Sequence, residues 1–287
     1  MGVEFRNYNN EDYDALILFF MECNANKENI NWNWARFEWM MHHAEFDETT
    51  VDAIGLWCDG NRIVAAAVYD MYFGEAFCGT LPGYEELYVE TVGYAQECLR
   101  DESGLGIAVR DTDDNKINTV KSMGMNYFTQ DENIMKLMLE TEFEYSIPEG
   151  MRICSFEPTE ENCDYEWLMW QGFDHGCDRA EFEAARNKCK CRPHLNPELC
   201  IFVKNNNDEI VSHACIWYDP QTDYAYVEPV FTLPDFRGMG LAKIAVFEGL
   251  NRAKRLGAKE AYVISDMDFY AKLGFVNDKH YTFWWIE

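Results

Sequence analysis

The stretch Glu228-Pro-Val-Phe-Thr-Leu-Pro-Asp-Phe-Arg-Gly-Met-Gly-Leu-Ala242 decides the fold of the second half of this 287-residue chain. It reads as an extended segment, a glycine-rich turn and the start of a long helix. The first N–H groups of a helix lack partners and its dipole is positive there, so this end attracts phosphate. Gly238 and Gly240 carry no side chain that would hold a ligand away from the backbone. The stretch therefore predicts a phosphate-binding turn.

The residues after the turn support a helix that packs closely on a sheet. Small and apolar residues recur at steps of three and four, which is typical of a narrow buried stripe: Ala242, Val246, Gly249, Ala253 and Leu256. Gly257 is expected to end this helix. The next strand is expected over 261–265.

Two motifs in this region resemble signatures of the GNAT acetyltransferase superfamily. The spacing Arg237-x-x-Gly240-x-Ala242 is similar to its pyrophosphate-binding signature, and Phe269-Tyr-Ala-Lys-Leu-Gly-Phe275 is similar to its second signature, in the family's order. The resemblance implies an α/β fold with a mixed, mostly antiparallel central sheet flanked by helices, and acetyl-CoA as acyl donor. One departure is the short loop 265–268, where many relatives have an asparagine and a longer loop.

The resemblance also implies where acetyl-CoA binds. In GNAT folds two neighbouring parallel strands splay apart, and the pantetheine arm pairs with backbone amides in the gap. By this likeness the cosubstrate contacts are Val230, Phe231, Thr232, Arg237, Gly238, Met239, Gly240, Leu241, Ala242 and Lys243. A local run of basic residues fits a polyanionic ligand, although a solvated helix face explains some of them: Arg237, Lys243, Arg252, Lys254, Arg255 and Lys259.

Glu228 and Tyr270 are the candidate catalytic residues. Alternation places Tyr224, Tyr226, Glu228, Val230 and Thr232 on one face of a strand, with Pro229 indicating an edge or a bulge. Glu228 is a candidate general base for an amine, directly or through water, or else a structural carboxylate. Tyr270 is a candidate general acid for the departing thiolate, or else a buried aromatic anchor.

The chain repeats one plan in two halves, over 1–145 and 146–287. Each half contains a predicted β-hairpin, 54–69 in the first and 199–218 in the second, and each ends in a strand, 134–140 and 281–286. Val120 stands in the first half where Tyr270 stands in the second. No glycine turn like 237–242 lies between Leu87 and Arg100. We therefore expect tandem GNAT-like domains, of which the first has a decayed cofactor site.

Composition limits the possible partners. The net charge of −27 opposes nucleic-acid binding, and no apolar run reaches the roughly 20 residues of a membrane span. Without an export signal, the eleven scattered cysteines indicate reduced thiols and a cytoplasmic location. Cys189, Cys191, His194 and Cys200 lack zinc-site spacing, so no metal is expected. The oligomeric state is left open.

Two aromatic segments and the charge bear on the acceptor. The cluster 32–40 is expected in the core, with a second domain or a ligand as the alternative. The segment Trp167–His175 is chosen as a substrate wall. The first half carries a net charge of −19 and the second −8, which favours a small cationic amine as acceptor, unless the acidity serves solubility alone.

The sequence thus predicts an acyl-CoA-dependent N-acetyltransferase that acts by direct attack in a ternary complex, since no cysteine occupies an evident nucleophile position. The alternative is a non-catalytic module that binds or senses acyl-CoA, because a fold alone does not establish a function.

Overall fold

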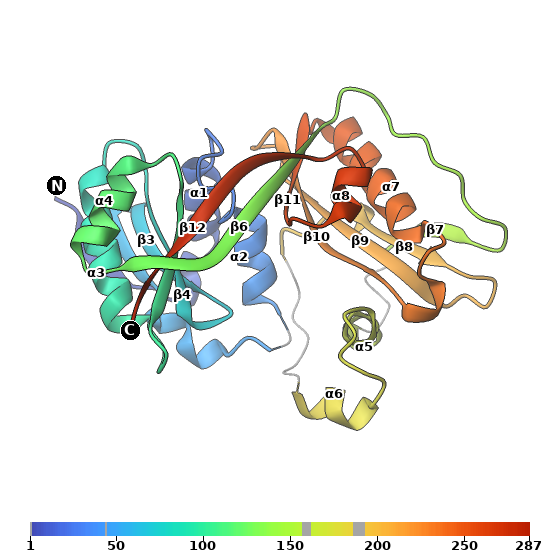
Figure 1. Ribbon diagram of the computed structural model, residues 1–287, viewed down its shortest axis with the longest axis horizontal. Helices are drawn as coiled ribbons and strands as arrows, with labels where there is room; N and C mark the ends of the chain where they lie inside the picture. The colour runs from blue at the N-terminus through green and yellow to red at the C-terminus, as the bar shows by residue number, and fades with distance from the viewer. Residues whose placement is uncertain (1, 44, 157–161, 186–192) are drawn as a thin grey trace. The chain divides into compact units, whose positions relative to one another are not determined.

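A computed structural model describes residues 2–43, 45–156, 162–185 and 193–287 of the protein (Figure 1). The chain forms two compact units. The first unit comprises Met1–Ile134, Ile264–Asp266 and Asn277–Glu287, and the second comprises Met135–Val263 and Met267–Val276. Each unit has a mixed sheet flanked by helices, which confirms the predicted α/β class.

The sheet of the first unit has the strand order β1-β2-β3-β4-β5-β12-β6. β4 and β5 run parallel, whereas β1–β2, β2–β3, β3–β4 and β5–β12 are antiparallel. Its strands are β1 (Glu4–Asn7), β2 (Gly55–Asp59), β3 (Arg62–Asp70), β4 (Tyr72–Thr80), β5 (Leu105–Arg110), β12 (Val276–Ile286) and the first part of β6 (Asn126–Met138). Its α-helices are α1 (Tyr13–Cys23), α2 (Trp34–Met41), α3 (Tyr88–Cys98) and α4 (Asp114–Ser122). In Figure 1, α3 and α4 lie together, away from α1 and α2.

The sheet of the second unit has the order β6-β11-β10-β9-β8-β7. β10 and β11 run parallel, and β9 pairs antiparallel with both β8 and β10. Its strands are the end of β6, β7 (Arg152–Ser155), β8 (Cys200–Lys204), β9 (Ile210–Tyr218), β10 (Tyr224–Thr232) and β11 (Glu260–Ile264). Its α-helices are α5 (Asn162–Gly172), α6 (Arg179–Ala185), α7 (Leu241–Leu256) and α8 (Asp268–Lys272).

The last strand of each half completes the sheet of the other half. β12 pairs with β5 from Tyr281↔Arg110 to Ile286↔Leu105, so residues 277–287 belong to the first unit although they end the second half of the sequence. β6, which ends the first half, lies beside β11 in the second unit. The two strands occupy equivalent places in the repeat, and each covers a sheet edge that would otherwise be unpaired.

The predicted hairpins are confirmed as β2–β3 and β8–β9. The long helix is confirmed as α7, which ends at Gly257 with φ 122°. Gly249 lets α7 approach the sheet, because a Cβ there would lie 2.4 Å from Ile216 Cγ1. No helix in the described ranges is long and apolar enough to cross a membrane.

The aromatic cluster 32–40 supplies core residues of the first unit. The side chains of Trp32, Trp34 and Phe37 are all buried. Trp32 stacks on Phe77 with the ring centroids 5.5 Å apart. The expected core-packing role is therefore confirmed for these three rings.

Candidate active site

β10 and β11 are paired over only a short length. Their parallel register runs from Tyr224↔Glu260 to Tyr226↔Tyr262, whereas β10 continues to Thr232 and β11 to Ile264. Beyond Tyr226, the recorded pairing of β10 with β11 therefore ends, although both strands continue. This is the opening in which the resemblance places the pantetheine arm.

A bulge at Pro229 changes which residues share a face of β10. Val227 pairs with Ile216 of β9, and Val230 pairs with Ala214, so β10 has one extra residue between them. Val230 packs against the same core as Val227. The alternation that placed Val230 and Thr232 on one face with Glu228 is therefore wrong beyond Pro229. Of the two alternatives predicted for Pro229, an edge or a bulge, the register shows a bulge.

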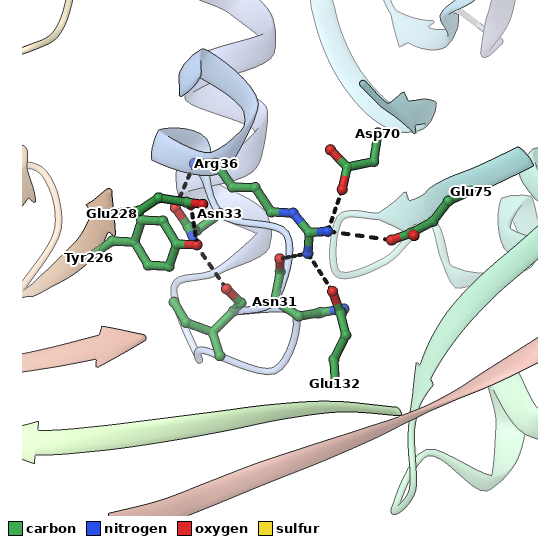
Figure 2. Close-up of polar contacts among 9 residues, drawn as sticks. Asn31, Asn33, Arg36, Asp70, Glu75, Glu132, Tyr226 and Glu228 are labelled. Carbon is green, nitrogen blue, oxygen red and sulfur yellow. Dashed lines mark hydrogen bonds and ion pairs between the residues drawn. The ribbon is translucent and has the colours of Figure 1, made fainter. Parts of the chain in front are cut away.

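Glu228 lies at this bulge and is held by a tyrosine of the same strand. The Tyr226 hydroxyl donates to Glu228 Oε2 over 2.6 Å, as Figure 2 shows. Trp217 Nε1 of β9 donates to the Glu228 carbonyl oxygen over 2.7 Å. Both the carboxylate and the backbone of Glu228 are thus fixed. Sequence reasoning placed Tyr226 on this face without giving it a role, and its position two residues before Glu228 was the available signal.

Tyr270 belongs to α8, in the same unit. Its side chain is buried among apolar residues. Burial, and next the charge of Glu228, raise the pKa of Tyr270 well above its usual value. A phenol is protonated at neutral pH, as a general acid must be, and the raised pKa makes this one a weaker acid than an exposed tyrosine.

The glycine turn has the open geometry that a phosphate group needs. Gly238 and Gly240 have φ of 80° and 78°, and a Cβ at either position would meet no atom within 4 Å. No side chain in the described part of the chain caps the N-terminus of α7, and its first turn carries no acidic residue. Backbone N–H groups at a helix start without a cap fit an anion. The residues present therefore fit the pyrophosphate of acetyl-CoA.

Several basic residues that were interpreted as facing a polyanion contact the chain itself. Lys254 Nζ donates to the carbonyl oxygens of Leu139 and Glu140, each over 2.8 Å. Arg255 Nε donates to Glu142 over 2.8 Å. Lys254 and Arg255 thus hold the segment between β6 and β7 against α7. Of the basic residues on this helix, Lys243 lies in the first turn, next to the glycine turn.

The segment chosen as a substrate wall lines a cavity of about 840 Å³ on the α5 side of the sheet. Trp167, Leu168 and Gln171 contribute to it, together with Leu233 beyond the end of β10. α5 ends on Phe231, because a Cβ on Gly172 would lie 2.6 Å from that ring. Phe231 lies between Glu228 and Leu233 in the sequence. The contact of Gly172 with Phe231 therefore separates Glu228 from the cavity that Leu233 lines.

The first unit repeats this architecture with different side chains. The β4–β5 ladder in the described part of the chain comprises Glu75↔Gly106 and Ala76↔Ile107, so it is short, as the β10–β11 ladder is. α3 begins at Tyr88. The window between Leu87 and Arg100, in which the sequence shows no glycine turn, is thus too late in the chain. The turn equivalent to 237–240 lies at 81–87, before the helix. There the Gly83 N–H donates to both carboxylate oxygens of Glu85, each over 3.0 Å.

A second polar cluster of the first unit surrounds Arg36 (Figure 2). Its guanidinium forms ion pairs with Asp70, Glu75 and Glu132. It also lies 4.8 Å from the centroid of the Trp32 ring. Three carboxylates share one cation, and burial, with the neighbouring carboxylates, raises the pKa of Glu75 to about 7.

Within the described ranges, no group of three His, Cys, Asp or Glu residues has the arrangement of a metal site. Of the cysteines considered for such a site, Cys189 and Cys191 lie outside the described residues. Cys200 is buried opposite Cys215, with the two Sγ atoms 3.4 Å apart.

Residues 160–275 match the family model of the acetyltransferase (GNAT) family. The fold of the whole chain is similar to that of a GCN5-related N-acetyltransferase from Sphaerobacter thermophilus, with 15% identity, a TM-score of 0.58 and coverage of 99% of this chain and 95% of that one. It is also similar to a tandem GNAT protein from the clavulanic acid biosynthesis pathway, with 14% identity, a TM-score of 0.61 and coverage of 100% and 98%.

A third similar structure is Saccharomyces cerevisiae N-myristoyltransferase with bound myristoyl-CoA, with 11% identity, a TM-score of 0.53 and coverage of 100% of this chain and 79% of that one. No curated protein matches the chain in sequence. The fold of the whole chain is thus that of a tandem GNAT-like α/β protein, and residues 160–275 match the acetyltransferase (GNAT) family.

Proposed function

We propose that the second unit transfers an acetyl group from acetyl-CoA to the amine of a small cationic molecule. The observation that carries the proposal is the position of three features in one unit: the open glycine turn, the gap beside β10, and the pair Glu228 and Tyr270. The turn would hold the pyrophosphate. The edge of β10 at Val230–Thr232, beyond its ladder with β11, would pair with the pantetheine arm, and acetyl-CoA supplies the activated acyl group.

The two candidate catalytic residues have complementary roles in this proposal. Glu228 accepts a proton from the arriving ammonium, directly or through water, and Tyr226 keeps its carboxylate in place. The amine nitrogen then bonds to the carbonyl carbon as the carbon–sulfur bond breaks. Tyr270 gives its proton to the departing thiolate, and the nitrogen then releases its second proton to the phenolate of Tyr270, directly or through water, which leaves the neutral amide.

The cationic acceptor is proposed from charge. The net charge of −27 would raise the concentration of cations near the protein. Such attraction is screened by salt, with a Debye length of about 8 Å at physiological ionic strength. kcat/KM for the right amine should therefore fall as salt rises.

The test is release of CoA from acetyl-CoA with polyamines, aminoglycosides, neutral amines and a lysine peptide. Salt-sensitive turnover of a cationic amine supports the whole proposal. A best acceptor that is uncharged, or one without salt dependence, overturns the charge argument and leaves the transferase in place. Binding of acetyl-CoA without turnover of any amine would favour the acyl-CoA-sensing alternative.

A further inference from the structure

Arg237 begins the turn that is expected to hold pyrophosphate, but its guanidinium is bound to another part of the chain. Nε donates to the Thr232 carbonyl oxygen over 3.0 Å, and Nη2 donates to the Gly172 carbonyl oxygen over 2.9 Å. Nη1 and Nη2 also donate to the two carboxylate oxygens of Asp174, over 2.9 and 3.0 Å. Arg237 therefore joins the end of β10 to the corner that follows α5.

The α5 corner is built to present this carboxylate. Asp174 has φ 63°, a left-handed conformation that non-glycine residues adopt uncommonly. Gly172, two residues earlier, packs against Phe231 of β10 and gives its carbonyl oxygen to Arg237. The corner is thus fixed at two points, on the strand that borders the pantetheine gap and on the glycine turn.

Stability alone does not account for the pair. The side chains of Arg237 and Asp174 are 45% and 62% exposed, and ion pairs this exposed contribute little to folding. The two-pronged geometry instead fixes the direction of the guanidinium. A guanidinium held in this way has its charge balanced by Asp174, which leaves the phosphate to the backbone N–H groups of the turn.

We propose that Asp174 is a positioning residue. It fixes the guanidinium of Arg237, and Arg237 then supports the turn so that the backbone of Gly238–Gly240 stays open for the pyrophosphate. The proposal rests on the assignment of acyl-CoA binding to this turn. It changes the role of Arg237 from a direct phosphate ligand to a support for the residues that contact phosphate. It also makes the α5 corner part of the acyl-CoA site.

The test is a double-mutant cycle on the full chain, with the dissociation constant for CoA measured by calorimetry. If Asp174 acts through Arg237, the pair works as one unit. Asp174→Ala and Arg237→Ala should then each weaken CoA binding by a similar factor, roughly five- to tenfold. The double variant should bind CoA no more weakly than either single variant. Arg237→Lys keeps the charge and loses the forked geometry, so it should behave like Arg237→Ala.

A direct phosphate ligand would give the opposite pattern. Asp174→Ala would then tighten binding by releasing the guanidinium, and Arg237→Lys would stay near the wild-type affinity; either result overturns the proposal, as does the absence of any effect. Asp235→Asn is the matched control, since it removes one negative charge two residues before Arg237 and is not a partner of the guanidinium. Failure of the wild-type chain to bind CoA would instead contradict the proposed function.

Discussion

The two units have similar turns before similar helices, but they differ in the acidic residues at these turns and in the first turn of each helix. Before α7, Gly238 and Gly240 leave the backbone open, and the first turn of the helix has no acidic residue. Before α3, the amide of Gly83 is already bound to Glu85, and Glu86 and Glu90 follow. Acidic residues of the chain itself thus lie near the end of α3 where the helix dipole would attract a phosphate, although no described side chain caps this helix either.

The difference shows how one backbone can leave the turn before a helix open in one copy and place acidic side chains there in the other. The backbone after Val120 in α4 repeats the backbone after Tyr270 in α8. Met125 N–H donates to the Val120 carbonyl oxygen and Phe275 N–H to that of Tyr270, both over 3.1 Å. The same framework therefore holds an ionisable phenol in the second unit and an aliphatic side chain in the first.

The largest expected effect comes from putting a carboxylate into the open turn. Gly240→Glu should weaken acetyl-CoA binding by roughly 100-fold or more, about 3 kcal/mol, because it sets a fixed anion beside the pyrophosphate site. Gly83→Glu is the matched control, since it changes a glycine with a similar φ of 90° in the turn of the first unit. Calorimetry on both folded variants measures the difference. Equal losses in the two variants would contradict the comparison.

The next effect concerns the phenol that Val120 replaces in the first unit. Tyr270→Phe should lower kcat by about 100-fold, the lower end of what general acid–base catalysis contributes, with little change in acetyl-CoA affinity. Tyr262→Phe is the control, since it removes another buried hydroxyl of this unit, bonded to Glu260 over 3.1 Å. An unchanged rate in Tyr270→Phe would reduce Tyr270 to a packing role.

A smaller loss is expected at Glu228. Glu228→Gln keeps the size of the side chain and a hydrogen-bond acceptor for Tyr226 but removes the base, so turnover should fall by roughly 10- to 100-fold. The loss should shrink at higher pH, where more of the amine is unprotonated. The pH profile of kcat/KM measures this. A loss that stays constant with pH would indicate positioning or folding instead.

The smallest effect is on stability, in the cluster around Arg36. Burial raises the folded-state pKa of Glu75 from 4.5 to about 7, so the folded state holds a proton that the unfolded chain releases between these values. This contribution to stability is complete below about pH 4.5 and is lost as the pH rises through about 7. Glu75→Gln should make the free energy of unfolding, measured with urea, less dependent on pH between about 4.5 and 7. An unchanged slope would contradict the assignment.

Local signals predicted much of this structure. Turn residues and alternating apolar residues located the β2–β3 and β8–β9 hairpins, and the glycine turn located the start of α7. These features depend on contacts within a few residues, which a single sequence displays directly. The glycines of the turn were identified for the same reason, since their positive φ needs no partner elsewhere.

Features that depend on distant partners could not be predicted in this way. β6 and β12 read equally well as the last strand of either sheet, so their exchange was invisible. Pro229 predicted an edge or a bulge, but the face of the sheet on which Val230 lies could be known only from the register of β10 with β9. The partner of Arg237 lies 63 residues away, at Asp174, where no motif indicates it.

The central claim is that only the turn of the second unit binds acyl-CoA, and the stoichiometry of the full chain tests it most directly. The intact chain is required, because β12 and β6 each complete the sheet of the other half. Calorimetric titration with acetyl-CoA should give one site per chain, and Gly240→Glu should remove it. Two sites per chain, or one site that persists in Gly240→Glu, would contradict the account.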